Sequence, residues 1–457
     1  MSDFRQRLYA CSPGILKEWL VAAEARRRNY YRRYGDYASV RKEYDLAKYR
    51  ELSNPDIRGL QFRFLRELVA YAREKSSFYR ARLPRQLERL EDVAAIPILS
   101  KEDIRNNMAD ITTEPVRNRA FYIGRTSGST GTPLEFRTGR EGIRARYAIQ
   151  DNYYAMYGCH YGERRVRLGG SQIKPAKAEK PPFWIYNRVD NQLQMSPWHI
   201  DSRSINHYMD EIERFRPKYF TGYAHALYRL AEHLWRNEKL THHPKAIFTD
   251  SEGAPPEYYR VIEEGFQAPC HDVYGISETG WIAVQCRHDV YHVLQLSCVL
   301  EVVDGVGRPL PYGQTGRLVV TDLTQKAVPY IRYDTGDLGS VSEAACECGW
   351  RTEILECLEG RSDDYVLTPQ GRRVGRLSHV TKPGRGILES QIAQTARDRI
   401  VIRVVPTESF EAPSMKAVVK TARERLGTGM QVEWELVDAI PRTKRGKFKH
   451  VVREIDD

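Results

Sequence analysis

Short runs of β-branched and aromatic residues alternate with stretches of helical periodicity between residues 120 and 340. The run CHDVYG at 270–275 is typical of a buried strand, whereas ALYRLAEHLWRNEKL at 226–240 has the apolar spacing of a helix. A chain that alternates such elements buries them as helices packed on a sheet. We therefore expect an α/β fold built from layers.

The sequence on either side of this region has a different pattern. Residues 15–75 are rich in Leu, Ala, Arg, Glu and Tyr at helical spacing, which predicts a helical N-terminal stretch. From about residue 285 the strand-like runs come without long helices between them, which predicts a β-rich part. After residue 360 the pattern restarts as strand, helix and strand. These changes predict a large N-terminal domain at 1–360, helical over about 1–95 and β-rich over about 285–350, and a small α+β C-terminal domain at 361–457.

Composition and charge limit the class of protein. The 457 residues are 41% hydrophobic and 29% charged, which is typical of a globular protein. We see no apolar run close to the roughly 18 residues of a membrane span and no secretory signal, so we expect a cytoplasmic protein. The net charge of +11 suits an anionic partner such as a nucleotide, coenzyme A, nucleic acid or a membrane surface.

A basic and aromatic cluster lies in the helical N-terminal stretch. It consists of Arg26, Arg27, Arg28, Arg32 and Arg33 with Tyr30, Tyr31 and Tyr34. Such a cluster binds RNA or an anionic membrane in some proteins and forms a solvated helix face in others. We favour the solvated face, because no nucleic-acid motif accompanies the cluster. The alternative is a non-catalytic protein that binds nucleic acid or a membrane surface, with salt-sensitive binding and no ATP turnover. Outside this alternative, we expect neither a nucleic-acid partner nor a membrane partner.

A loop of glycines and hydroxyl residues follows the strand-like segment at 121–125. It begins Thr126, Ser127, Gly128, Ser129, Thr130 and Gly131. Glycines let backbone N–H groups approach phosphate oxygens, and the hydroxyl groups add further donors. The loop can therefore hold a triphosphate, although a polar turn has the same composition. It is not a Walker A loop, because no Gly-Lys-Ser/Thr follows.

Four further motifs follow this loop in order. They are YGISET at 274–279, YIRYDTGD at 330–337, GRSDD at 360–364 and PRTKRGK at 441–447. Together the five motifs resemble those of the adenylate-forming superfamily of acyl-CoA synthetases, peptide-synthetase adenylation domains and luciferases. The segment IPILSKEDIR at 96–105 and the closing stretch are similar to the phenylacetate-CoA ligase branch, particularly its capsule-biosynthesis-type relatives.

The resemblance implies an ATP- and magnesium-dependent ligase that converts a carboxylic acid to acyl-AMP, releases pyrophosphate and transfers the acyl group to coenzyme A. Relatives also pass the acyl group to an amine or to a carrier-protein thiol, and the sequence leaves this alternative open. Lys447 would stabilise the charge that grows at the α-phosphate. Glu278 would hold the magnesium ion. The small C-terminal domain would be mobile and turn about a hinge at Asp363 or Asp364.

The resemblance also assigns the nucleotide and acyl contacts. The 126–131 loop would hold the β- and γ-phosphates, Tyr274 would stack on adenine, and Asp337 would bind the ribose hydroxyls with Arg361 beside it. The remaining expected ATP contacts are Ser251, Glu252, Gly253 and Gly275. For the acyl pocket the expected contacts are Tyr223, His225 and Trp281, although aromatic residues in α/β cores more often serve packing.

Four residues have the types and spacing of a zinc site. Cys346 and Cys348 form a Cys-x-Cys pair, and Cys286 and His292 form a Cys-x5-His pair in the same β-rich part. Zinc prefers thiolate and imidazole ligands in a closed tetrahedron, so the four predict a structural site. His288 competes with His292 as the fourth ligand, and the resemblance favours His292. We expect the other cysteines to be packing residues.

Overall fold

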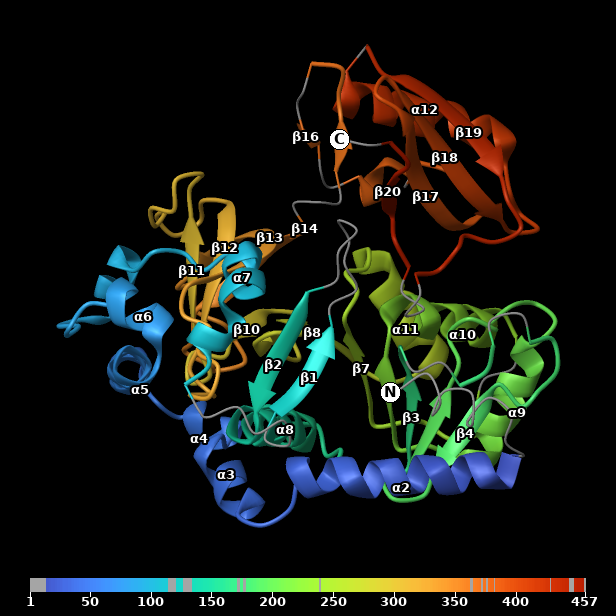
Figure 1. Cartoon of the computed structure of the whole chain (residues 1–457). Coiled ribbons are helices and arrows are strands. Elements are labelled where there is room, and N and C mark those ends of the chain that lie inside the picture. The colour runs from blue at the N-terminus through green and yellow to red at the C-terminus, as the bar shows by residue number, and fades with distance from the viewer. Residues whose placement is uncertain are drawn as a thin grey trace.

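The computed structural model is shown in Figure 1. It describes residues 14–113, 121–125, 134–170, 173–175, 178–237, 240–361, 365–370, 373–374, 377–381, 383–427, 429–443 and 448–455.

A single twelve-stranded sheet runs through the larger part of the molecule. Its strands are β3 (Arg165–Leu168), β4 (Trp184–Asn187), β5 (Gln192–Met195), β6 (Tyr219–Gly222), β7 (Ala246–Asp250), β8 (Cys270–Ile276), β9 (Gly280–Gln285), β10 (Tyr291–Val293), β11 (Cys298–Val303), β12 (Gly316–Asp322), β13 (Tyr333–Ser342) and β14 (Ile354–Arg361). Their spatial order is β11-β12-β13-β14-β10-β9-β8-β7-β6-β3-β5-β4. The expected α/β fold is confirmed.

The sheet changes character along its width. Strands β5, β3, β6, β7 and β8 are parallel, whereas β9, β10, β14, β13, β12 and β11 pair antiparallel from β8 outward. The β-rich part expected at 285–350 is thus an antiparallel continuation of the main sheet. The change of direction follows from the short connection after β8, which is too short for a crossover helix and returns the chain as an antiparallel neighbour.

Helices cover both faces of the parallel strands. Phe220 packs with α10 (Ala224–Arg236) and α11 (Pro256–Phe266) in one core cluster, whereas the preceding residue Tyr219 packs with α8 (Arg140–Met156) in another. Successive side chains of a strand point to opposite faces, so both faces of β6 are buried. This explains why residues 219–222 of β6 and 246–249 of β7 are buried without a break.

The helical N-terminal stretch is confirmed over residues 15–75. The helices are α2 (Gly14–Arg32), α3 (Tyr37–Glu43), α4 (Leu46–Tyr49), α5 (Asn54–Lys75), α6 (Ser77–Arg82) and α7 (Lys101–Ile111), with a 3-10 turn at Leu90–Ala95. The Ser100 hydroxyl accepts the Asp103 N–H, and the Asp103 carboxylate accepts the Ser100 N–H, so α7 begins with a capping box. None of the described helices combines the length and the apolar character needed to cross a membrane.

The basic cluster of α2 differs in part from its expected solvated face. Arg33 donates two hydrogen bonds to the carboxylate of Asp151 on α8, each over 2.8 Å, and its side chain is 7% exposed. Its guanidinium also lies over the rings of Tyr147 and Tyr161. Arg33 therefore anchors α2 to the rest of the molecule. Sequence alone could not show this role, because Asp151 is 118 residues away.

The C-terminal unit has its own four-stranded sheet. Its strands are β17 (Ile387–Ala396), β18 (Arg399–Pro406), β19 (Gln431–Leu436) and β20 (Val451–Arg453), in the order β19-β18-β17-β20, and α12 (Met415–Leu426) packs beside them. Figure 1 shows this unit above α10 and α11. Ile392 and Ile400 of the sheet and Val418 of the helix share one core. This α+β arrangement is the one predicted for the C-terminal domain.

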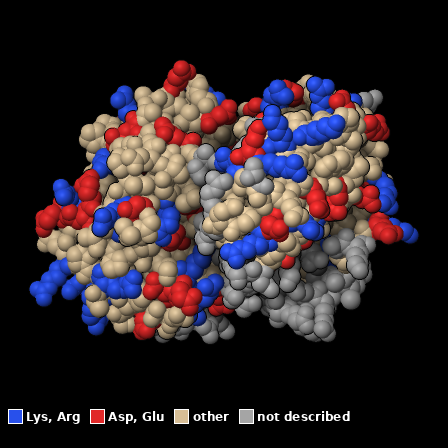
Figure 2. Space-filling model, turned by 90° about the horizontal axis from the view of Figure 1, so that it is seen from above, with Lys and Arg blue, Asp and Glu red and all other residues tan. Residues whose placement is uncertain are grey.

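Charged side chains of both signs are interspersed on the face that Figure 2 shows. Blue and red side chains alternate across it, so the net charge of +11 does not gather there into one basic area. A nucleic-acid binding face would carry a continuous basic stripe. This face does not favour the binding-protein alternative.

Candidate active site

The candidate site contains three segments, and each begins where one of three neighbouring parallel strands ends. Strands β6, β7 and β8 are paired in parallel and end at Gly222, Asp250 and Ile276. The residues that follow them therefore meet at one edge of the sheet. In open parallel sheets, ligands bind outside this carboxyl edge. The edge gathers the residues expected for the acyl and adenine pockets and for magnesium, namely Tyr223, Ser251, Glu252, Gly253 and Glu278.

Two hydrogen bonds join the motif at 274–279 to the motif at 330–337. The Tyr274 hydroxyl donates to Oδ2 of Asp337 over 2.8 Å, and the Tyr333 hydroxyl donates to Oε1 of Glu278 over 2.9 Å. All four side chains are buried. The structure thus brings the expected adenine, ribose and magnesium residues into one connected site. Tyr333 was not singled out from the sequence, although it lies inside a quoted motif.

The backbone around Glu278 is held from α8. Arg146 donates to the carbonyl oxygens of Ser277 and Glu278, and it pairs with the buried Asp322 over 3.4 Å. One long side chain therefore fixes the turn between β8 and β9. The carboxylate of Glu278 supplies hard oxygen donors, which are the ligands that magnesium prefers.

Gly275 has a steric role next to Tyr274. A Cβ atom at this position would lie 2.5 Å from the carbonyl oxygen of Gly280 on β9. A larger residue would push the two strands apart and move the Tyr274 ring. Gly275 is therefore required for the shape of the site.

Other expected nucleotide residues are placed by their neighbours. Asp337 lies directly opposite Arg361 in the pairing of β13 with β14. Ser251 has a backbone φ of 69°, in the left-handed region, and turns the chain sharply after β7. Glu252 accepts the backbone N–H of Phe448 over 2.8 Å, which links the adenine segment to the C-terminal motif.

Several expected site residues lie outside the described residues. They are the phosphate loop Thr126, Ser127, Gly128, Ser129, Thr130 and Gly131, the hinge residues Asp363 and Asp364, and Lys447; for Arg361 only the backbone is described. The strands that flank the loop, β1 (Phe121–Arg125) and β2 (Glu135–Gly139), are paired with Arg125 opposite Glu135.

The three expected acyl-pocket residues lie in different surroundings. Tyr223 is buried at the start of α10 in the core beneath that helix. Trp281 on β9 packs edge-on against Tyr153 and Tyr154, each at 5.8 Å between ring centroids. His225 faces the C-terminal unit, where its Nε2 lies 2.7 Å from Oε1 of Glu389. The geometry of Trp281 favours packing over substrate contact.

The four expected metal ligands converge. The ligand atoms of Cys286, His292, Cys346 and Cys348 all lie within 4.8 Å of one another. The sulfurs of Cys286 and Cys346 are 3.7 Å apart, and the Cys348 sulfur is 3.2 Å from Nε2 of His292. Tetrahedral zinc with sulfur ligands at about 2.3 Å sets two sulfurs about 3.8 Å apart. The spacing therefore fits zinc, and it is too wide for a disulfide.

Groups around the cluster orient its ligands. The Thr352 hydroxyl lies 3.1 Å from Nδ1 of His292, which directs the other ring nitrogen at the sulfurs. The N–H of Trp350 donates to the Cys348 sulfur over 3.4 Å. Arg50, next to α4, donates to the Cys348 carbonyl oxygen. The cluster thus ties the N-terminal helices to the antiparallel part of the sheet.

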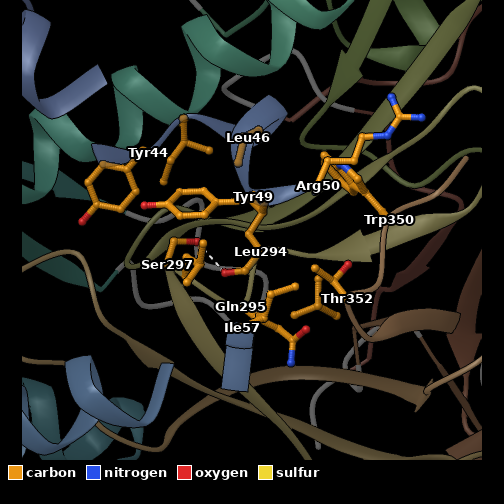
Figure 3. A pocket seen from close by; sticks show the side chains of 13 residues that line it. Tyr44, Leu46, Tyr49, Arg50, Ile57, Leu294, Gln295, Ser297, Trp350 and Thr352 are labelled. Atoms are coloured by element: carbon orange, nitrogen blue, oxygen red, sulfur yellow. Dashed lines mark hydrogen bonds between the residues drawn. The ribbon is translucent and has the colours of Figure 1, made fainter. Parts of the chain in front are cut away.

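A narrow cavity lies beside the cluster (Figure 3). Tyr44, Leu46, Tyr49, Trp350 and Thr352 are among the side chains that line it. Its volume of about 30 Å³ is far below that of a substrate pocket. We therefore assign it to packing between α4 and the cluster.

Buried histidines make the fold sensitive to acid. Burial lowers the pKa of both His225 and His271 to about 4. The unfolded chain takes up these protons below about pH 6.5, but the folded chain takes them up only near pH 4. Stability is therefore full above pH 6.5 and declines as the pH falls from 6.5 to 4. At pH 5 the lowered pKa of His271 should reduce the free energy of unfolding by about 2 kcal/mol.

Thermal melts at pH 7.5 and pH 5 test this expectation, with His271→Phe as the comparison. The variant should lose less stability between the two pH values than the original protein. Equal acid-induced losses in the two proteins would refute the assignment to His271.

Comparisons with known proteins agree with this geometry. The family model for the CapK C-terminal domain matches residues 366–454. Protein CapK of Staphylococcus aureus is 25% identical over 98% of this chain and 99% of its own length. Phenylacetate-coenzyme A ligase of Thermus thermophilus is 26% identical over 69% of this chain and 73% of its own length. The comparisons thus support the expected resemblance to the phenylacetate-CoA ligase branch and its CapK-type relatives.

Two solved structures of one ligase, each in a different state, resemble this chain. The match to 2-hydroxyisobutyryl-CoA ligase in the postadenylation state, in complex with R3-HIB-AMP, has a TM-score of 0.68 at 21% identity. The match to the same enzyme in the thioesterification state, with 2-HIB-AMP and CoA, has a TM-score of 0.51 at 22% identity. Both matches cover 88% of this chain and 90% of the other. The chain therefore has the fold of this ligase.

Proposed function

We propose that the protein uses ATP and magnesium to convert a carboxylic acid to its acyl-AMP and then transfers the acyl group to coenzyme A. The observation that carries the proposal is the pair of hydrogen bonds from Tyr274 to Asp337 and from Tyr333 to Glu278, at the carboxyl edge of the parallel strands. These bonds join an aromatic ring and two carboxylates, which are the groups needed to hold adenine, ribose and magnesium. The named ligase relatives support the same chemistry.

In the first half-reaction, a carboxylate oxygen of the acid attacks the α-phosphorus of ATP, and the bond to pyrophosphate breaks. Tyr274 and the 251–253 segment would position adenine, and Asp337 would accept hydrogen bonds from the ribose. Magnesium held at Glu278 would neutralise phosphate charge. The ammonium group of Lys447 would stabilise the negative charge that grows on the reacting oxygens.

In the second half-reaction, the coenzyme A sulfur attacks the acyl carbon, the thiol proton is lost and AMP leaves. An amine or a carrier-protein thiol would react at the same carbon and yield an amide or a different thioester. The acyl-AMP supplies a good leaving group to each of these acceptors. Identifying the acceptor is therefore a separate measurement from detecting adenylation.

We further propose that Cys286, His292, Cys346 and Cys348 hold a structural zinc ion. Four protein ligands fill a tetrahedron and leave no position for substrate. The cluster would then stabilise the fold and take no part in the chemistry.

Pyrophosphate release tests the proposed function. Purified protein is given ATP, magnesium and single acids from a panel of aryl, fatty and amino acids. Release that depends on one acid would support adenylation. Coenzyme A, amines or carrier protein is then added to find which acceptor raises turnover. Absence of magnesium-ATP binding by calorimetry, together with absence of release across the panel, would overturn the proposal.

A further inference from the structure

The carboxylate of Glu389 reaches from the C-terminal unit to the N-terminal domain. Glu389 lies near the start of β17, and its side chain is only 1% exposed. A single oxygen atom, Oε1, meets three donors: His225 Nε2 at 2.7 Å, Arg229 Nη1 at 2.8 Å and Arg442 Nη2 at 2.5 Å. His225 and Arg229 belong to α10, whereas Arg442 belongs to the C-terminal motif PRTKRGK.

The negative charge of Glu389 holds Arg442 in its position. Burial raises the pKa of Glu389, but the hydrogen bond from His225 and the charges of Arg442 and Arg229 hold it well below the usual range. Glu389 is therefore ionised and sits between two guanidinium groups. Without its negative charge, the two guanidinium groups would lose the carboxylate oxygen that both of them contact.

A second contact holds the other end of the same segment. Glu252 accepts the backbone N–H of Phe448 over 2.8 Å and the backbone N–H of His225 over 3.3 Å. The Phe448 ring stacks on the His225 ring, with 4.1 Å between centroids and 3° between planes. Arg442 and Phe448 are thus both fixed against α10. In the sequence they bracket Lys447, the expected catalytic lysine.

The interface around these groups is nearly closed. A cavity of about 10 Å³ remains among His225, Arg229, Glu252, Arg442 and Phe448, which is room for about one water molecule. Leu388, next to Glu389, packs against the core beneath α10. The contact is therefore a packed interface between the C-terminal unit and α10.

We infer from the comparisons that the C-terminal unit lies as in the postadenylation state of the ligase that resembles the chain. The same enzyme matches better in its postadenylation state than in its thioesterification state, although equal shares of the chains are covered. Because the two structures are of one enzyme in different states, the difference in TM-score is explained by a different arrangement of its parts. The Glu389 contact accordingly belongs to the adenylation orientation.

We propose that Glu389 is a positioning residue for adenylation. This rests on the proposed function: Glu389 would fix Arg442 against α10, and Arg442 lies five residues before the expected catalytic Lys447. Glu389 itself does not touch the reacting atoms. The contact breaks when the C-terminal domain turns for acyl transfer, so Glu389 matters to the first half-reaction and not to the second.

Two half-reactions and one measurement of dynamics test the proposal in the full-length protein. Glu389→Gln removes the charge and keeps the shape, and Glu389→Asp keeps the charge on a shorter side chain. Glu411→Gln is the matched control, because Glu411 is an exposed carboxylate of the same domain with one arginine partner at 3.6 Å. The readouts are ATP–pyrophosphate exchange, acyl transfer from a chemically prepared acyl-AMP, and hydrogen–deuterium exchange of peptides from 437–455.

In Glu389→Gln, pyrophosphate exchange should fall about 100-fold, because one partner of a buried charge cluster is lost. Acyl transfer should stay within about threefold, since that step does not use the contact. Amide exchange of 437–455 should be about tenfold faster. Glu389→Asp should recover part of the lost activity, and Glu411→Gln should match the original protein in all three readouts.

Equal loss in both half-reactions, or unchanged amide exchange in Glu389→Gln, would overturn the proposal. Thermal melting of each variant shows whether it is folded, and Glu389→Asp replaces Glu389→Gln if the latter is not. The two proposals fail in different ways. An original protein that neither binds magnesium-ATP nor releases pyrophosphate refutes the proposed function, whereas unchanged amide exchange in Glu389→Gln refutes the positioning contact alone.

Discussion

Replacing Lys447 by alanine should lower the rate of acid-dependent ATP–pyrophosphate exchange by about a thousandfold. The reason is that negative charge grows on the attacking oxygen and on the α-phosphate during adenylation, and a positioned ammonium group compensates it only at that stage. ATP affinity should change less than tenfold, since the ground state gains little from this charge. Exchange of labelled pyrophosphate into ATP gives the rate, and calorimetry gives the affinity.

Lys449→Ala is the matched control for this experiment. Lys449 lies two residues away in the same basic stretch, so a general effect of positive charge would appear in both variants. A catalytic Lys447 predicts a large loss in one variant and near-normal exchange in the other. Comparable losses in both variants would contradict the catalytic assignment of Lys447. They would indicate that the stretch acts only through its general positive charge.

Removal of zinc should produce the largest change in stability. A structural zinc ion contributes on the order of 10 kcal/mol to folding in small domains. Cys348→Ser removes the sulfur that contacts His292. Because Arg50 beside α4 binds the carbonyl oxygen of the same residue, α4 should become less firmly packed. We expect zinc content to fall from about one ion per chain to none, and the melting temperature to fall by about 10 °C or more. Metal analysis and thermal melting measure the two effects.

Cys357→Ser serves as the control, because Cys357 is a half-buried thiol outside the cluster. It should keep its zinc and nearly all of its stability. Treatment of the original protein with a strong chelator should reproduce the loss seen in Cys348→Ser. Fewer than one zinc ion per chain in protein purified without chelator would contradict the metal assignment.

Local sequence patterns predicted the helices and strands better than they predicted which strands pair with each other. The run CHDVYG was predicted as a buried strand, and it forms most of β8. The continuous sheet was not predicted, because the pairing of Tyr291 with Leu355 joins segments 64 residues apart. Only long-range packing selects that pairing from the available antiparallel strands.

The same distinction applies to the candidate site. The metal ligands could be predicted because each pair is close in sequence and has a characteristic residue type. The hydrogen bond from Tyr274 to Asp337 spans 63 residues, and its geometry depends on the direction of two buried side chains. Glu389 carried no signal at all, since a single glutamate at the start of a strand looks like a surface residue. Its role comes entirely from the three donors around it.

The two sheets define one boundary in the chain that none of their strand pairings crosses. The strand pairings of the large sheet extend to Arg361 on β14, and the pairings of the C-terminal sheet begin at Ile387 on β17. A cut between residues 270 and 361 would separate paired strands and bare a hydrogen-bonding edge, which invites aggregation. A cut near residue 365 would leave the ladders of both sheets intact. Recombination among relatives could therefore exchange whole C-terminal units, provided that the incoming unit brings a carboxylate to meet His225 and Arg229.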